Sequence, residues 1–132
     1  TDLITNFFAN NKIKNIYLAD IAKIEFHSAF WRKIRMKNIV PEKALGVINK
    51  FTEFYNKYNW IKSDNKIKEN AKNYVNQYGL YGLRTLDAIQ FACAMYIKMN
   101  NDKNIYCVTT DKIMTSVMKL ANLNLALNID FQ

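Results

Sequence analysis

The stretch Leu83–Thr110, LRTLDAIQFACAMYIKMNNDKNIYCVTT, decides the fold. Its first part, Leu86–Met99, is so strongly apolar that we expect a helix buried on more than one side, capped by Thr85. After the polar turn NNDKN, Ile105–Thr109 is rich in β-formers and has the length of a strand. A buried helix followed by a short apolar strand is half of an alternating α/β pattern.

The same alternation continues in both directions from this stretch. Asn15–Ala19 (NIYLA) is predicted as a strand, and Asp20 as the N-cap of the next helix. Pro41 favours a first helical turn, and Gly79 and Gly82 end a helix. The predicted helices cover 3–10, 21–37, 41–57, 65–78, 86–99 and 112–121, and the predicted strands 15–19, 60–61, 105–109 and 125–129. This order predicts a mostly parallel sheet covered on both faces, a three-layer α/β/α sandwich.

Length and composition indicate one globular domain over residues 1–132. Half of the 132 residues are hydrophobic, which excludes a disordered chain. No run approaches the roughly 18 apolar residues of a membrane span, and no signal peptide opens the chain, so we expect a cytoplasmic protein without membrane contact. Cys93 and Cys107 have apolar neighbours and are predicted to be reduced, buried thiols.

The charge balance points to a polyanionic partner. Nineteen Lys and Arg against eleven Asp and Glu give a net charge of +8, which favours RNA or DNA. The alternative is a charge excess that serves solubility alone. Four cations fall within WRKIRMK, namely Arg32, Lys33, Arg35 and Lys37. Such residues also stabilise the last turn of a helix through its dipole.

Three acidic residues are expected to meet at one edge of the predicted sheet. Glu25 lies in the first turns of the helix after strand 15–19, Asp87 lies in the first turn of helix 86–99, and Asp111 follows strand 105–109. Crossover connections bring these positions to the carboxyl edge, where open α/β sheets hold their sites. Each residue also has an ordinary interpretation: a favourable charge at a helix start, an N-cap or a surface charge.

Clustered acids on a basic protein suggest a specific chemistry. Carboxylates in apolar surroundings need a compensating cation, and Mg²⁺ or Mn²⁺ prefers oxygen ligands. A divalent ion beside a basic surface predicts a metal-dependent phosphodiesterase that acts on nucleic acid.

The segments LRTLDAIQFA (Leu83–Ala92), VTTDKIM (Val108–Met114) and IEFHSAFWRKIR (Ile24–Arg35) stand in a characteristic order and spacing. Together they resemble PIN-domain ribonucleases, particularly the VapC-type toxins of toxin–antitoxin pairs, over about residues 3–130. The resemblance implies that Glu25, Asp87 and Asp111 are the catalytic, metal-binding acids. Thr109 would then be a polar residue beside the site. Arg84 would contact phosphate or serve as a structural arginine at a helix start.

The resemblance also implies a PIN-like fold and an Mg²⁺-dependent (or Mn²⁺-dependent) endoribonuclease. Basic side chains such as Arg32, Lys33 and Arg35 would attract the RNA. The implied protein partners are a second copy of the chain and an antitoxin that lies over the basic, acid-lined groove. The alternative is a non-catalytic module that binds RNA or a protein partner.

One part of the family pattern has no counterpart before Glu25. PIN domains begin with an apolar strand that ends in Asp and lies in the middle of the sheet. We therefore expect an N-terminally incomplete domain with three of four acids, which is poorly stable or inactive alone. Upstream extension is expected to restore Mg²⁺-dependent cleavage.

The single histidine and a group of aromatic residues receive structural interpretations. His27 points away from Glu25 on a helix and is expected to be partly buried or on the surface rather than a general base. The aromatic residues are Phe51, Phe54, Tyr55, Tyr58 and Trp60. We expect them to form core, or a dimer or partner face, in preference to a platform for stacking bases.

Overall fold

The computed structural model describes residues 2–100, 104–127 and 129. The chain forms two compact units. We call Asn15–Lys62 the inserted unit, and Thr1–Lys14 together with Ser63–Gln132 the main unit. Each unit is described separately below.

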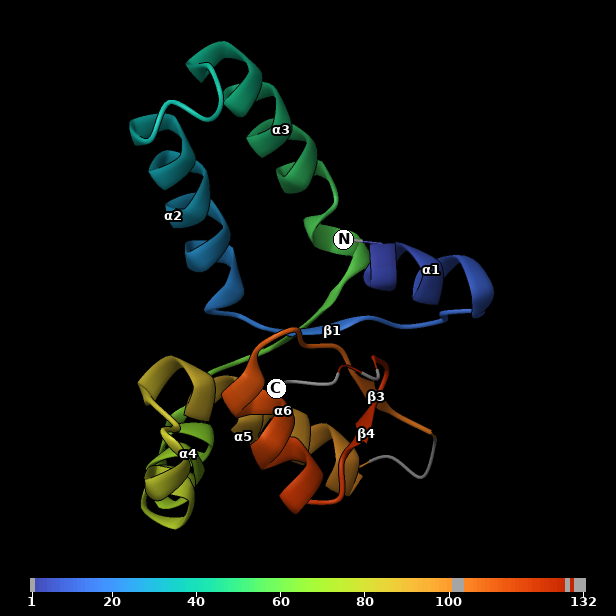
Figure 1. Cartoon of the computed structure of the whole chain (residues 1–132), viewed down its shortest axis with the longest axis vertical. Helices are drawn as coiled ribbons and strands as arrows, with labels where there is room; N and C mark the ends of the chain where they lie inside the picture. Colours follow the sequence, from blue (N-terminus) through green and yellow to red (C-terminus); the bar gives the residue numbers. More distant parts are fainter. Residues whose placement is uncertain (1, 101–103, 128, 130–132) are drawn as a thin grey trace. The chain divides into compact units, whose positions relative to one another are not determined.

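The inserted unit is a helical hairpin whose two ends form a short parallel sheet. Helices α2 and α3 lie side by side in Figure 1. Its elements are β1 (Tyr17–Ala19), α2 (Ala22–Arg35), α3 (Pro41–Glu53), the 3-10 helix η1 (Tyr55–Lys57) and β2 (Asn59–Ile61). Strand β1 pairs with β2 from Tyr17 opposite Asn59 to Ala19 opposite Ile61. Pro41 opens α3, as its sequence position predicts.

Aromatic rings form the centre of the inserted unit. The rings of Phe26 and Phe51 stack with centroids 3.5 Å apart, which joins α2 to α3. Tyr55 connects this pair to β2, because its carbonyl accepts a hydrogen bond from Trp60 Nε1 at 2.8 Å. The Tyr55 hydroxyl lies 2.6 Å from His27 Nε2, and His27 is half-buried. Phe51, Tyr55, Tyr58 and Trp60 are only half-buried and Phe54 is exposed at 41%, so the five aromatic residues are not a fully buried core, whereas the partly buried position of His27 is confirmed.

The main unit is built around the apolar helix predicted from the sequence. Phe91 of α5 is fully buried, and Tyr74 and Tyr78 of α4 meet its ring edge-on at 4.8 and 5.7 Å. The elements are α1 (Asp2–Asn10), α4 (Asn65–Tyr78), the 3-10 helix η2 (Gly79–Tyr81), α5 (Thr85–Asn100), β3 (Tyr106–Cys107), α6 (Lys112–Leu120) and β4 (Asn124–Leu125). Strands β3 and β4 are parallel, with Cys107 opposite Leu125.

The predicted three-layer sandwich is wrong. The structure is 65% helical, and its described strands form two separate two-stranded parallel sheets, β1–β2 and β3–β4. The predicted strand 105–109 is reduced to Tyr106–Cys107, because Thr109 already belongs to the turn that starts α6. In place of the predicted strand 125–129, strand β4 covers Asn124–Leu125 and so begins one residue earlier, and residue 128 lies outside the described residues.

Two predicted helix caps are also wrong. Asp20 lies one residue before the N-cap position of α2, and its backbone N–H donates to the Ile61 carbonyl at 2.9 Å, which extends the β1–β2 ladder. Ile21 takes the N-cap position without a side-chain hydrogen bond. Thr85 is the first residue of α5 and not its cap.

Both cysteines are free and buried, as predicted. Burial raises the pKa of the Cys107 thiol, and the charge of Lys98 partly opposes this shift. The ionised form is thus disfavoured in the folded state. As the pH rises above about 9, the unfolded chain loses this proton first, so the free energy of unfolding falls.

We expect native Cys93 and Cys107 to react with a disulfide reagent at pH 8 at least about 10-fold more slowly than in the unfolded chain. Absorbance at the reagent's thiolate band gives both rates. Cys107→Ala should react at one site only and lose part of the decline in stability above pH 9. Fast labelling of both native thiols would contradict this prediction.

Candidate functional site

Helices α5 and α6 of the main unit run parallel, so both begin at the same end. Gly82, just before α5, has a left-handed φ of 93°, and a Cβ added there would lie 3.2 Å from Cδ1 of Ile113 in the first turn of α6. At the other end, Lys98 Nζ of α5 donates to the Asn122 carbonyl at 2.8 Å, just beyond the last residue of α6. The first turns of the two helices are therefore neighbours.

Asp111 is fixed at the start of α6 by four hydrogen bonds, one of which runs from the Thr115 backbone N–H to the Asp111 carbonyl at 3.0 Å. Its Oδ1 accepts from the Met114 backbone N–H at 2.7 Å, which confirms the N-cap interpretation. Its own N–H donates to Thr109 Oγ1 at 3.1 Å, and its carbonyl accepts from Thr115 Oγ1 at 2.7 Å. Asp111 is exposed, and its other carboxylate oxygen, Oδ2, has no hydrogen-bond donor within the described part of the chain.

Asp87 lies in the first turn of α5 and is half-buried. Among the described residues, its carboxylate takes part in no hydrogen bond or ion pair. The positive end of the α5 dipole stabilises a negative charge at this position. Thr109 is half-buried in the turn before α6, and Arg84 is exposed directly ahead of α5. The structure therefore brings Asp87, Asp111, Thr109 and Arg84 to the two neighbouring helix beginnings of the main unit.

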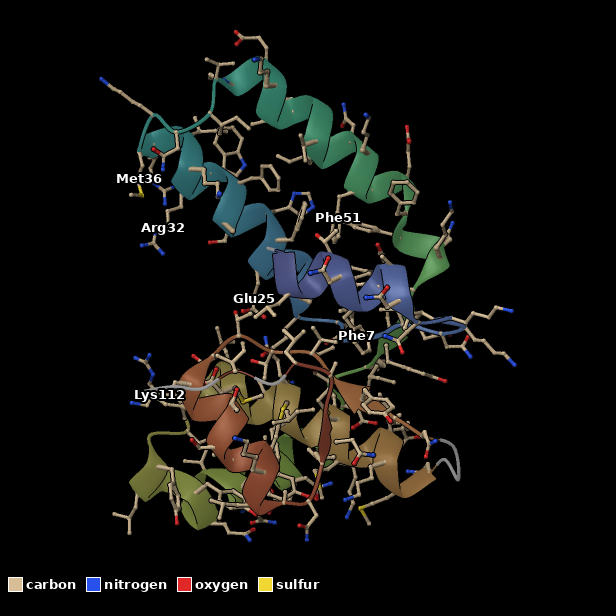
Figure 2. The ribbon with its side chains drawn as sticks, turned by 45° about the vertical axis from the view of Figure 1, so that its right-hand side comes forward. Phe7, Glu25, Arg32, Met36, Phe51 and Lys112 are labelled. Carbon is tan, nitrogen blue, oxygen red and sulfur yellow. The ribbon has the colours of Figure 1, made fainter. Side chains whose placement is uncertain are left out.

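The other predicted site residues belong to the inserted unit. Glu25 lies in the first turn of α2 and is half-buried. Arg32, Lys33 and Arg35 are exposed in the last turn of the same helix. Figure 2 shows Arg32 on the side of α2 that faces away from α3. Since the two units are described separately, the convergence of Glu25 with Asp87 and Asp111 stays a prediction.

The donor set at the helix beginnings suits a hard divalent cation. Asp87 and Asp111 offer carboxylate oxygens and Thr109 a hydroxyl oxygen, and Mg²⁺ is commonly held by one or two carboxylates together with water and phosphate. No group of three or more His, Cys, Asp and Glu side chains that could hold a metal ion is found over 2–100, 104–127 and 129. The main unit thus supplies a pair of acids.

Two features of the structure were not predicted as functional. Lys112, exposed at the first position of α6, places a cation directly after Asp111. Trp31 is exposed on α2 between the basic residues of the inserted unit. The signal for Trp31 was available in the sequence, because Arg32 follows it directly and Arg35 lies one helical turn later.

Comparison of the chain with protein-family models, curated proteins and solved structures gave no match. A functional proposal therefore depends on the residues and their geometry. Among the described helices, none has both the length and the apolar character that a membrane crossing requires.

Proposed function

We propose that this chain is a Mg²⁺- or Mn²⁺-dependent endoribonuclease related to the VapC-type toxins. Its supporting observation is the parallel pair α5 and α6, whose neighbouring first turns carry Asp87 and Asp111. These are two of the three acids that the resemblance assigns to the metal. We further propose a cytoplasmic homodimer that is controlled by an antitoxin protein.

The residues at this end have complementary tasks in the proposed reaction. Asp87 and Asp111 of the main unit would hold the cation, which when bound would promote ionisation of water and stabilise negative charge on the phosphate, and a metal-binding role of Glu25 stays a prediction from the resemblance. The hydrogen bond from Met114 N–H orients the Asp111 carboxylate through Oδ1. Arg84 and Lys112, both exposed, bind phosphates of the RNA backbone beside the acids.

The basic end of α2 contributes to binding rather than to the chemical step. Arg32, Lys33 and Arg35 are exposed and positively charged, so they attract the RNA polyanion over distance. This contribution depends on salt concentration, whereas the contribution of the acids depends on the divalent ion. An assay that varies the salt and the divalent ion independently therefore separates the contribution of the basic residues from that of the acids.

The test of the proposal is cleavage of a mixed RNA pool by the protein expressed from its complete natural reading frame. We expect cleavage with Mg²⁺ and none with EDTA, and a loss of at least about 100-fold in Asp87→Asn, because several kcal/mol of transition-state stabilisation depend on the metal site. Circular dichroism checks that the variant folds. Equal cleavage by Asp87→Asn would remove Asp87 from the mechanism.

A non-catalytic binding module is the second candidate, and one observation favours it. Asp111 already has a complete structural role as the N-cap of α6, which needs no metal. RNA binding without Mg²⁺-dependent cleavage by the wild-type protein would support this candidate and overturn the nuclease proposal.

A further inference from the structure

The outer face of α2 combines apolar and basic side chains in one row. Ile24, Ser28, Trp31 and Arg35 are spaced by four, three and four residues, which places them on the same face of the helix. All four are exposed, Ile24 at 73% and Trp31 at 48%. The inner face of α2 is different, because Phe26 there stacks on the rest of the inserted unit.

The two tryptophans of the chain have different surroundings. Trp60 is part of the aromatic centre, with its ring edge-on to Tyr55 and its indole N–H bonded to the Tyr55 carbonyl. Trp31 makes no ring contact and no side-chain hydrogen bond with the residues that the structure describes. A large, half-exposed indole that stacks on no other ring leaves its aromatic face accessible to a ligand.

The charges around Trp31 are uncompensated. Arg32, Lys33, Arg35 and Lys37 are all exposed, and none of them pairs with a carboxylate among the described residues. Figure 2 shows Arg32 and Met36 directed away from α3. A ligand for this face must therefore be negatively charged and must offer a flat surface to an indole.

We propose that the outer face of α2 binds single-stranded RNA, with Trp31 stacked on an unpaired base and Arg32 and Arg35 on the adjacent phosphates. Single strands expose base faces that duplexes keep stacked, and they combine these faces with regularly spaced charges. Charge complementarity with the four cations favours this ligand. An anionic membrane is disfavoured, because the charged Arg35 lies on the same face as Ile24 and Trp31, whereas membrane-surface helices separate apolar from charged faces.

This inference takes its choice of RNA from the proposed function and assigns a residue that selects unpaired bases. It predicts that binding depends on base stacking as well as on charge. Removing the base from the ligand and removing the indole from the protein should therefore have the same effect.

The experiment measures binding in EDTA by fluorescence anisotropy, using an unstructured RNA of about 12 nucleotides and an abasic strand of equal length and charge. We expect the wild-type chain to bind the base-containing strand about 5- to 100-fold more tightly. Trp31→Ala should abolish this preference. Tyr96→Ala, which removes another aromatic side chain exposed at 48%, should retain it.

Two further variants separate stacking from charge. Arg35→Gln should weaken binding of both strands equally and reduce the salt dependence by about one phosphate contact. In Trp31→Phe only Trp60 remains as a tryptophan, so quenching of tryptophan emission by RNA should disappear if Trp31 is the stacking residue.

Three outcomes would overturn the inference. These are an unchanged base preference in Trp31→Ala, equal binding of both strands by the wild type, and binding to phosphatidylserine vesicles without binding to RNA. The outcome is independent of the nuclease proposal, because EDTA prevents metal-dependent cleavage. If the wild-type protein cleaves RNA but binds the base-containing and abasic strands equally, only the stacking role of Trp31 is rejected. If the wild-type protein prefers the base-containing strand but does not cleave RNA, only the nuclease proposal is rejected.

Discussion

Asp111→Asn is expected to lower kcat/KM for Mg²⁺-dependent RNA cleavage by at least about 100-fold while leaving the free energy of unfolding nearly unchanged. Asparagine is as good an N-cap as aspartate, because its amide oxygen can accept the hydrogen bond from Met114 N–H. It lacks the negative charge that a divalent cation requires. The substitution therefore separates the N-cap role of Asp111 from its proposed metal-binding role, whereas alanine would remove both.

The chain offers a matched control for this variant. Asp64 caps α4 in the same way, with the Ile67 backbone N–H donating to Oδ1 at 2.9 Å. Asp64→Asn should leave both cleavage and stability unchanged. Cleavage kinetics and urea denaturation of the two variants give the comparison. Full activity in Asp111→Asn would show that Asp111 is a cap and nothing more.

Phe91→Ala is expected to destabilise the main unit by about 3 to 5 kcal/mol. The Phe91 side chain is 0% exposed and holds α5 against Tyr74 and Tyr78 of α4, so truncation leaves a cavity between the two helices. This loss is comparable to the total stability of many small domains. Urea denaturation followed by circular dichroism measures it.

Met99→Ala is the control for the cavity effect, because Met99 lies on the same helix and is 77% exposed. It should change the free energy of unfolding by no more than about 0.5 kcal/mol. Similar losses in the two variants would mean that α5 is not packed through Phe91.

The helices were largely predictable from sequence, because their signals are local. The predicted helix 65–78 coincides with α4, which begins after a capping aspartate and ends at Gly79. The sheet was not predictable in the same way. Apolar runs such as Ile105–Thr109 show a preference for burial, whereas the length of a strand depends on which partner is available for hydrogen bonding. Here each described sheet has only two strands, and their pairing covers three residues in β1–β2 and two residues in β3–β4.

The candidate site was also predictable only where its residues follow from local sequence signals. Asp87 and Asp111 could be placed near helix beginnings because both follow from short-range patterns, and the parallel course of α5 and α6 brings these beginnings together. The N-cap role of Asp111 was also foreseeable, since aspartate is a preferred N-cap. Glu25 belongs to the other unit, and contacts between distant segments of a chain are not encoded in residue periodicity.

The division of the main unit into two stretches of sequence affects the order in which the chain folds during synthesis. Helix α1 packs through Phe7 against Tyr106, with ring centroids 6.4 Å apart, although the entire inserted unit and helices α4 and α5 are translated between them. On the ribosome, α1 therefore emerges long before its partner exists. The inserted unit is contiguous and can fold first, while the main unit is completed only after its last segment has been synthesised.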